Sequence, residues 1–499
     1  MIKETLRFAT ERKTFHLFIC IYILISLMGM YFTPLFDEDE GFFAEASRQM
    51  LATGDYVTIN VNGEERYDKP ALFFWFNVLS IKLFGINEFA VRLPSFIFFI
   101  LTLILLYNFS KKYYQTSNAY ISVVIMTSIV QFQVLARACV SDNLLNLLVA
   151  AALFSFYHYF EKSKISSLFW LYTFAGLGFL TKGPLAFVVI FGVILFFLIL
   201  SKNLVLLLKI LNPIFILWSV IIPFPWFYLA YLKSGDFLFT DFFIKHNLSR
   251  FSQTMESHGG YWWYYFPVII LSFIPFAHLL FPSFKSLKFN DKNIFLLTWF
   301  LLPFVLFSFS KTQLPHYISI GYIPLIILIS QSKNLNFNAI YLQISLVILL
   351  FLIAPTLVKH LDIKDENVNQ MLKKSSLIFD SNYIWTMMLL FVLANILYFL
   401  KKQYILGSLV LFSLAVSIFI YKYGLLQQGF IKQTGLKLRN SKQEIFMKDH
   451  YNPSLSFYAK RVFSIKQNFE KGDIVLSRFP VENTDSTLAS GSGFILLEK

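Results

Sequence analysis

The residues best suited to chemistry lie in one segment near the start of the chain. Four consecutive acids, Asp37-Glu38-Asp39-Glu40, follow an apolar stretch, and Tyr67-Asp68-Lys69-Pro70 comes later in the same loop. Neighbouring carboxylates raise one another's pKa unless a cation faces them, so this cluster is suited to proton transfer or cation binding. The alternative is a solvated loop that ends the preceding helix.

The composition indicates how these residues are positioned. Hydrophobic residues make up 57% of the chain, charged residues only 14%, and the mean hydropathy is +0.61. These values exclude an ordinary soluble protein and predict a mainly α-helical, polytopic membrane protein. The net charge of +14 is not concentrated in a polar domain, which favours contact with anionic lipid and argues against nucleic acid.

Apolar stretches separated by short polar loops predict about thirteen membrane spans, several of them shorter than the usual length of about 20 residues. They cover residues 15–36, 91–109, 119–134, 144–160, 168–180, 185–200, 210–231, 262–281, 294–309, 317–330, 339–358, 383–400 and 405–421.

Lysine and arginine gather before the first span and in alternate loops, which we therefore expect to be cytoplasmic. The other loops then share the outer face. These are the acidic loop, the turns at residues 137–142 and 181–184, and the loops at 233–261 and 310–316. We expect a bacterial inner membrane with a periplasmic active face; an endoplasmic reticulum membrane is the eukaryotic counterpart.

Two domains are predicted. Residues 1–421 form the membrane domain, with residues 37–90 as its catalytic outer loop, and residues 422–499 form a small α/β domain on the outer side. Residues 473–477 and 493–497 have the pattern of short strands, and residues 441–448 have the pattern of a helix.

Two helices are predicted within the outer loop. Between residues 41 and 51, Phe43, Ala46 and Met50 recur at helical spacing, and Glu45 and Arg48 fall on the opposite face, as in a helix lying in the membrane interface. A second apolar helix over residues 71–85 is too short to span with ease. It should bring Lys69 back toward Asp39.

These motifs carry a family resemblance. The segment from Asp39 to Leu51 and the later motifs resemble the membrane glycosyltransferases that use polyprenyl-phosphate sugars, above all the lipid A aminoarabinose transferases and more distantly the protein O-mannosyltransferases. The later motifs are Gly54-Asp55-Tyr56, Asn62-Gly63, Tyr67 to Pro70, residues 91–95, Ala136-Arg137 with Asp142, Thr181 to Pro184, Arg250-Phe251, His258 before residues 262–265, Leu314 to Tyr317, and Tyr451 to Tyr458.

The resemblance implies a GT-C fold, with a helix bundle open to lipid for the polyprenyl tail and an outer cavity for the phosphate-linked sugar. The sequence departs from the aminoarabinose transferase pattern at two positions. Phe42 stands where that pattern has arginine, and Asp68 where it has glutamate. Sugar or phosphate recognition therefore need not be the same.

A phosphate leaving group needs no proton near neutral pH, so one base is enough for inverting transfer and the second acid of a glycosidase can be absent. We expect Asp39 to take the proton from the acceptor hydroxyl, with helix capping as its alternative role. Glu40 is expected to orient the site or the loop. Asp142 has two roles open, an arginine partner or cap and an acceptor-binding carboxylate.

A cationic clamp for the donor phosphate is expected from side chains of the outer loops, because arginine and lysine both suit phosphate oxygens. The candidates are Lys69, Arg137, Lys182 and Arg250, with His316 and Tyr317 as further contacts to sugar or phosphate. Snorkelling at the interface is the alternative for the cations, and anchoring for the other two.

Asp68 with His246 or His258 is the candidate site for a divalent cation, which the resemblance also implies. Surface or packing histidines are the alternative. The expected partners are a polyprenyl-phosphate sugar donor, a glycolipid or protein acceptor, and membrane lipid. Two other functions stay open: a transporter or flippase of a lipid-linked saccharide, which would need ionisable groups near mid-span, and a non-catalytic assembly partner.

Overall fold

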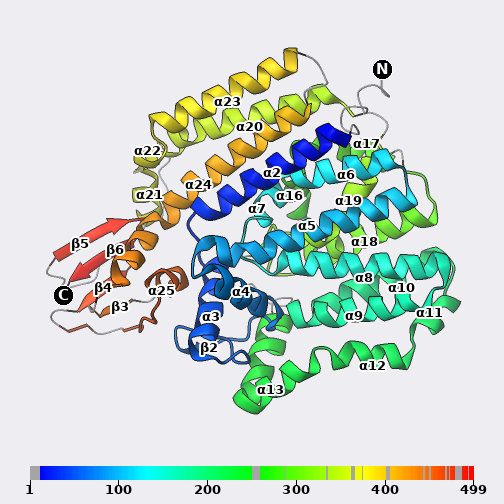
Figure 1. Cartoon of the computed structure of the whole chain (residues 1–499), viewed down its shortest axis with the longest axis horizontal. Coiled ribbons are helices and arrows are strands. Elements are labelled where there is room, and N and C mark those ends of the chain that lie inside the picture. The colour runs from blue at the N-terminus through cyan, green and yellow to red at the C-terminus, as the bar shows by residue number, and fades with distance from the viewer. Residues whose placement is uncertain are drawn as a thin grey trace.

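The computed structural model describes residues 12–249, 259–285, 287–332, 335–360, 366–373, 375–400, 405–441, 444–448, 451–466, 469–470, 473–477, 486–492 and 494–498. Long helices run roughly side by side across the molecule (Figure 1). A small sheet and the helices α3 (Asp39–Thr53), α4 (Leu72–Phe84) and α25 (Pro453–Ala459) lie together at one end of them (Figure 1).

Within the described residues, seven helices are long and apolar enough to cross a membrane. They are α2 (Arg12–Phe32), α5 (Glu88–Tyr113), α8 (Asp142–Lys162), α18 (Asp291–Ser308), α20 (Phe337–Val358), α23 (Ser381–Phe399) and α24 (Ile405–Leu438). The chain is a multi-span membrane protein, as its composition predicts.

Two further apolar segments are bent. The pair α12 (Pro213–Ile221) and α13 (Phe224–Ser234) turns by 46°, and α16 (Tyr265–Ser272) turns by 118° into the segment Ala277–Lys285, which comprises η2 (Ala277–Leu279) and α17 (Leu280–Lys285). If each pair is one span, the described residues contain up to nine. The count of about thirteen therefore stays a prediction.

Shorter helices connect or complete these spans. They are α6 (Thr116–Ser128), α7 (Val130–Leu135), α9 (Ile165–Lys182), α10 (Pro184–Leu200), α11 (Val205–Ile210), α14 (Asp236–Leu238), the π-helix η1 (Phe239–Leu248), η3 (Tyr317–Gly321), α19 (Tyr322–Ser330), α21 (Glu366–Lys373) and α22 (Ser375–Ile378).

The sharp turn between α9 and α10 shows how the sequence places a functional residue. Gly183 has a φ of +64°, a conformation that favours glycine, and Pro184 then starts α10 at its first position. A Cβ atom at Gly183 would overlap the ring of Phe242. Lys182, the last residue of α9, is thereby held at the same end of the bundle as the first residue of α8.

The outer loop contains the two expected helices, but α3 differs from the prediction in its exposure. Glu45, Arg48 and Gln49, expected on a polar outer face, are buried along with the apolar face. The physical reason is a long-range one, because α25 packs against α3 and covers the side that would otherwise meet water. Arg48 and Gln49 satisfy the buried carboxylate of Glu45 within the helix.

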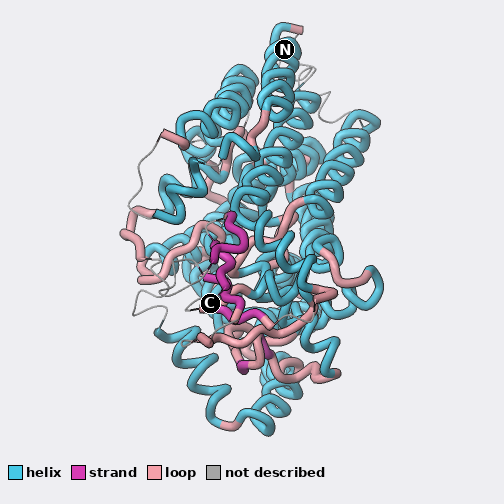
Figure 2. Tube along the Cα trace, turned by 90° about the vertical axis from the view of Figure 1, so that its left-hand side faces the viewer, coloured by secondary structure: helices cyan, strands magenta, loops and turns pink. Residues whose placement is uncertain are grey.

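A four-stranded sheet forms the centre of the C-terminal region, in the order β3-β4-β6-β5. Its strands are β3 (Ile445–Met447), β4 (Ile474–Ser477), β5 (Ser486–Gly491) and β6 (Phe494–Glu498), and β3 is parallel to β4 while the other pairs are antiparallel. Figure 2 shows the strands together in front of the helices.

The helix predicted for residues 441–448 is wrong, because Ile445 and Met447 turn inward as a strand and pair with β4. Helix α24 continues without a break past residue 421, the expected domain boundary, and its residues Ile431 and Leu438 pack into the core of the C-terminal region. The division into domains stays a prediction.

A hairpin of β1 (Asn60–Val61) and β2 (Glu64–Glu65) completes the outer loop, and the C-terminal region is bonded to this loop at several points. Asp37 Oδ1 accepts hydrogen bonds from the backbone N and the Oγ of Ser454, at 3.1 and 2.6 Å. Ser456 bonds the Asn62 side chain at 2.8 Å. The outer loop and the C-terminal region therefore build one structure at one end of the helix bundle (Figure 1).

Candidate active site

A cavity of about 140 Å³ lies where the outer loop meets the ends of the spans. It is lined by seven of the candidate site residues singled out in the sequence: Asp39, Asp68, Lys69, Asp142, Lys182, His316 and Tyr317. They come from the start of α3, the loop before α4, the start of α8, the end of α9 and the start of η3. The structure thus brings Lys69 and Asp39 to one cavity.

Asp39 is the first residue of α3 and its side chain is exposed to the cavity. The residue at the N-cap position is Glu38, which makes no side-chain capping bond. The capping role considered for Asp39 is therefore not seen. An accessible carboxylate that faces a cavity is placed to take a proton from a substrate bound there.

Asp142 and Lys182 form an ion pair, with 2.8 Å between Oδ1 and Nζ. Their side chains are 7% and 8% exposed. Asp142 thus pairs with a lysine, and the expectation of an arginine partner is wrong. The Lys182 ammonium also lies 5.7 Å from the centre of the Tyr317 ring, a distance that permits a cation–π contact.

His316 lies half-buried beside this pair. Burial lowers the pKa of its imidazole, Lys182 and Lys69 lower it further, and Asp142 and Asp39 oppose them; the result is a pKa below the ordinary value. The ring is therefore neutral near pH 7 and can accept or donate a hydrogen bond without adding charge.

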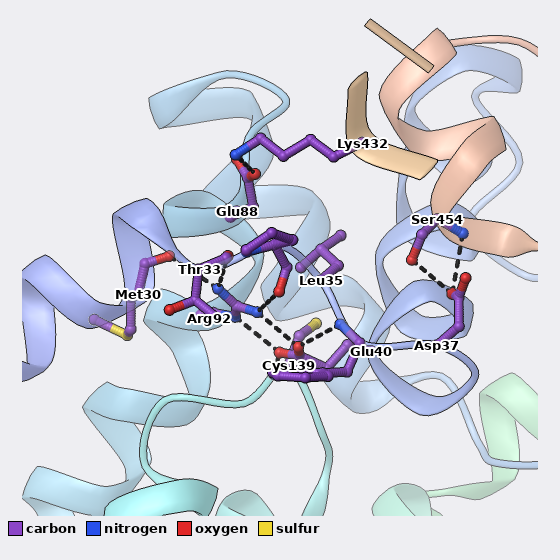
Figure 3. A network of polar contacts seen from close by, with 12 residues as sticks. Met30, Thr33, Leu35, Asp37, Glu40, Glu88, Arg92, Cys139, Lys432 and Ser454 are labelled. Atoms are coloured by element: carbon purple, nitrogen blue, oxygen red, sulfur yellow. Dashed lines mark hydrogen bonds and ion pairs between the residues drawn. The ribbon is translucent and has the colours of Figure 1, made fainter. Parts of the chain in front are cut away.

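Glu40 lies outside this cavity, although the sequence places it next to Asp39. Both of its oxygens are taken, because Oε1 accepts from Arg92 Nε at 2.8 Å and Cys139 N at 2.6 Å, and Oε2 accepts from Arg92 Nη2 at 2.7 Å and Phe36 N at 3.0 Å (Figure 3). Its carboxylate therefore holds the loop to Arg92 and Cys139 and does not line the cavity.

Arg92 is the partner of Glu40, and sequence reasoning missed it. It lies 1% exposed, and besides Glu40 it donates to the backbone carbonyls of Met30, Thr33 and Pro34 (Figure 3). This network joins the end of α2, the start of α3 and the turn at Cys139 that leads to Asp142. The family-like motif at residues 91–95 contains this arginine and could have drawn attention to it.

Arg137 does not reach the cavity. The prediction that it belongs to the phosphate clamp is therefore corrected. It lies buried among the helices, donates to Gln133 Oε1 and to Ser417 Oγ, and packs its side chain close to Gly29. Its contacts join α7, α2 and α24. A guanidinium turned into the bundle in this way has a structural role.

A second cavity of about 90 Å³ adjoins the first, and Asp68, Lys69, Asp142, Lys182 and Tyr317 line both. His246 lines only the second. Lys69 donates to the carbonyl of Asp68 at 3.1 Å. Two lysines thus face the shared space, and they are the described residues best placed to bind a phosphate.

Asp68 and His246 lie together as predicted, and Asp241 joins them, with ligand atoms that all lie within 4.8 Å of one another. His246 Nε2 is 2.9 Å from Asp68 Oδ1 and 3.4 Å from Asp241 Oδ1. Two carboxylates and an imidazole suit zinc or a similar divalent ion. Asp241 was not among the sequence candidates, because no local pattern in the 233–261 loop marks it; its approach to Asp68 is a long-range contact. His258 and Arg250 lie outside the described residues.

The charges around this cluster favour ionised carboxylates and a protonated imidazole, and a bound metal would displace that imidazole proton. Burial alone would raise the pKa of Asp68, but His246, Arg66 and Lys69 outweigh it and hold the pKa well below its usual range. Burial lowers the pKa of His246, whereas Asp241 and Asp68 raise it above the ordinary value. The carboxylates are therefore ionised, as metal ligands must be.

The chain is similar in sequence and in fold to known membrane glycosyltransferases. A family model described as dolichyl-phosphate-mannose-protein mannosyltransferase matches residues 68–228, a range that includes Lys69, Asp142 and Lys182. The crystal structure of ArnT from Cupriavidus metallidurans bound to undecaprenyl phosphate superposes with a TM-score of 0.80 at 17% identity, covering 96% of this chain and 97% of that one. The chain has a GT-C fold.

Two relatives extend the comparison of this GT-C protein. An undecaprenyl phosphate-alpha-4-amino-4-deoxy-L-arabinose arabinosyl transferase of Aeromonas hydrophila is 31% identical over 319 residues, which are 62% of this chain and 58% of the relative. An uncharacterized protein of Aquifex aeolicus is 27% identical over 94% of this chain and 93% of its own length. The chain thus spans little more than half of the first relative. The resemblance to the polyprenyl-phosphate sugar transferases is confirmed.

Proposed function

We propose that the protein is an inverting glycosyltransferase. It moves a sugar from a polyprenyl phosphate, of which undecaprenyl phosphate is the bacterial form, to a hydroxyl or phosphate acceptor on lipid A, another glycolipid or a protein. The observation that carries the proposal is the shared cavity, in which the exposed Asp39 carboxylate lies with Lys69 and Lys182. A base and a phosphate clamp in one water-accessible space are what this reaction requires.

The proposed reaction assigns one task to each group. Lys69 and Lys182 bind the donor phosphate, and the acceptor oxygen attacks the anomeric carbon from the opposite side. The bond from that carbon to the phosphate oxygen breaks, its electron pair leaves with the polyprenyl phosphate, and the acceptor proton passes to Asp39. Since the leaving phosphate carries its own negative charge, no second acid is needed.

Asp68, Asp241 and His246 are proposed to hold a divalent cation. When bound, the ion supplies positive charge next to Lys69. Asp241 accepts a hydrogen bond from the backbone N of Tyr67 at 2.9 Å and so ties the loop that carries Lys69 to η1, and an ion held by Asp241 and Asp68 would add to this tie.

The proposed location is a bacterial inner membrane, with the cavity on the periplasmic side. Support comes from the lysines and arginines, which gather before the first span and in the loops at the other end of the bundle. We expect alkaline phosphatase fused after residue 498 to be active. A fluorescent protein fused at the same place should be dark. The reverse pattern would place the cavity in the cytoplasm.

Transfer of labelled sugar tests the reaction itself. The donor is a radiolabelled pool of undecaprenyl phosphate-linked sugars, and the acceptor is a bacterial membrane extract. Asp39→Asn should lower the rate by about 10²–10⁴-fold, the usual contribution of a general base. Asp236→Asn, an exposed acid outside the two cavities described above, is the matched control. Equal labelling by Asp39→Asn and wild type would rule out Asp39 as the base.

The two other functions predict different results. A flippase would move the labelled lipid across proteoliposomes without changing it chemically. An assembly partner would neither transfer nor move it. The cavity residues all cluster at one end of the bundle, which supports transfer at a surface over a pathway through the membrane.

A further inference from the structure

A third cavity lies beside the first, and we call it the lateral cavity. It has a volume of about 550 Å³ and is formed by the β1–β2 hairpin, the segment from Phe237 to Lys245, and the C-terminal residues Tyr451 and 463–465. The volume falls within the range of about 300–1,000 Å³ that is usual for ligand pockets. The neighbouring cavity of about 140 Å³ holds Asp39, and it is too small for both a donor sugar and an acceptor.

Two residues, Arg66 and Tyr451, line both the lateral cavity and the Asp39 cavity. Arg66 bonds Asp68 Oδ2 at 2.8 Å, and its guanidinium lies 5.1 Å from the centre of the Phe42 ring, which lines the Asp39 cavity. Arg66 is therefore fixed between the two spaces. Ligand groups on either side of it would be close to each other.

Tyr451 lies at this junction, because it lines both cavities. Among the described residues, its oxygen is buried without a hydrogen-bond partner. Burial, Glu45 and Asp37 raise the pKa of the phenol well above its ordinary value, so the hydroxyl keeps its proton. A buried hydroxyl without a partner is costly, and a ligand that accepts its hydrogen bond would remove that cost.

The charges of the lateral cavity disfavour a phosphate. Each of its two cations already has an acidic partner, since Arg66 pairs with Asp68 at 2.8 Å and Lys245 with Asp241 at 3.2 Å. Glu64 and Glu65 add exposed negative charge at the edge. Phe237 and Phe463 contribute aromatic rings. These carboxylates, the amide of Asn62 and the aromatic rings together suit a ligand rich in neutral hydroxyl groups.

We propose that the lateral cavity holds the saccharide of a glycolipid acceptor, that Tyr451 hydrogen-bonds it, and that the transferred sugar is added to a neutral hydroxyl of this saccharide. The proposal rests on the proposed function. The acceptor hydroxyl would extend past Arg66 and Tyr451 into the Asp39 cavity. Its oxygen bonds the anomeric carbon, its proton goes to Asp39, and the polyprenyl phosphate leaves with the electron pair of the broken bond.

Filling the lateral cavity tests its role. Ser464→Trp places a large ring in it, and Val462→Trp is the matched control, because Val462 is exposed two positions away and does not line the cavity. Ser464→Trp should raise the KM for a membrane glycolipid extract at least tenfold. The KM for the labelled donor, and its slow hydrolysis by water, should stay at wild-type values. Tyr451→Phe should raise the acceptor KM by about tenfold, as expected for one hydrogen bond.

The chemistry of the acceptor is tested with one extract divided in two. One half is treated with phosphatase, so that both halves carry the same saccharides and only one carries phosphate monoesters. Transfer to the treated half at an undiminished rate supports a neutral hydroxyl acceptor. Loss of transfer after phosphatase, or labelling of protein in place of glycolipid, overturns the inference.

The failures of the two proposals are distinguishable. If wild type transfers sugar and Ser464→Trp does so with an unchanged acceptor KM, the lateral cavity is not the acceptor site, and the glycosyltransferase proposal stands. If wild type neither transfers nor hydrolyses any donor of the pool, both proposals fall.

Discussion

Asp142 and Lys182 form a buried ion pair between the first residue of α8 and the last residue of α9, with 2.8 Å between Oδ1 and Nζ. The pair lines the Asp39 cavity and lies where two neighbouring helices meet the outer loop. The same lysine is proposed to bind phosphate. When the donor binds, Lys182 would thus give up part of its contact with the Asp142 carboxylate and gain a contact with the donor phosphate.

Removing either partner of this pair should destabilise the protein. Lys182→Met or Asp142→Asn leaves a buried group without its partner, which typically costs about 3–5 kcal/mol of unfolding free energy. The double variant should be less destabilised than the sum of the two single variants. Thermal unfolding in one detergent–lipid mixture measures all three, and strict additivity would show that the two groups do not interact.

The contact of Glu40 with Arg92 should govern stability more than chemistry. Glu40→Gln removes the charge that Arg92 requires, and Arg92→Lys loses the fork that bonds Glu40 and three carbonyls. We expect about 3–5 kcal/mol of destabilisation for Glu40→Gln. Transfer per folded molecule should fall far less than for Asp39→Asn. A kcat loss as large as that of Asp39→Asn, with unchanged stability, would return Glu40 to the catalytic groups.

The cluster of Asp68, Asp241 and His246 should bind one divalent ion. Elemental analysis of protein purified without chelator should find a near-equimolar metal, and the ligand types favour zinc. Asp241→Asn and His246→Ala should lose it, whereas His360→Ala, an exposed histidine elsewhere, should keep it. Metal retained by both cluster variants would contradict the assignment.

Gly41 should tolerate no larger residue, because the outer loop and α25 meet there. A Cβ atom at this position would overlap Asp37 Oδ1 and come within 2.7 Å of Ser454 Oγ. Gly41→Ala should therefore loosen the C-terminal region, which limited proteolysis would detect as faster cleavage. Gly429→Ala is the control, since its nearest neighbour would be 3.9 Å away and alanine favours a helix. Equal cleavage of the two variants would show that the contact does not hold the region in place.

The sequence predicted those features that depend on local pattern. Apolar length predicted a multi-span membrane protein, and the parity of charged loops placed Asp39, Lys69, Asp142 and Lys182 on one face; the structure brings these residues to a common cavity. Pattern could not say which arginine faces that cavity. Arg137 turns into the bundle toward Gln133, and this choice depends on how α2 and α24 pack against it.

The remaining errors have the same physical origin. The polar side of α3 looks like a solvent face until α25, which lies hundreds of residues later, covers it. Residues 441–448 favour a helix locally, yet Ile445 and Met447 gain burial by pairing with β4. Long-range packing decided each case, and no window of sequence contains both partners.

The bond between Asp37 and Ser454 joins residues 417 positions apart, so it also constrains biogenesis. Asp39 lies in the loop after the first span, whereas Tyr451 and Pro453 follow α24, the last candidate span of the described residues, and line the same cavity. Because a membrane chain emerges from its N-terminal side first, the nascent protein contains Asp39 long before the residues that complete the cavity around it. The cavity is thus completed in one late step, and a chain arrested before residue 451 would have its spans in place but lack two of the side chains that line the cavity.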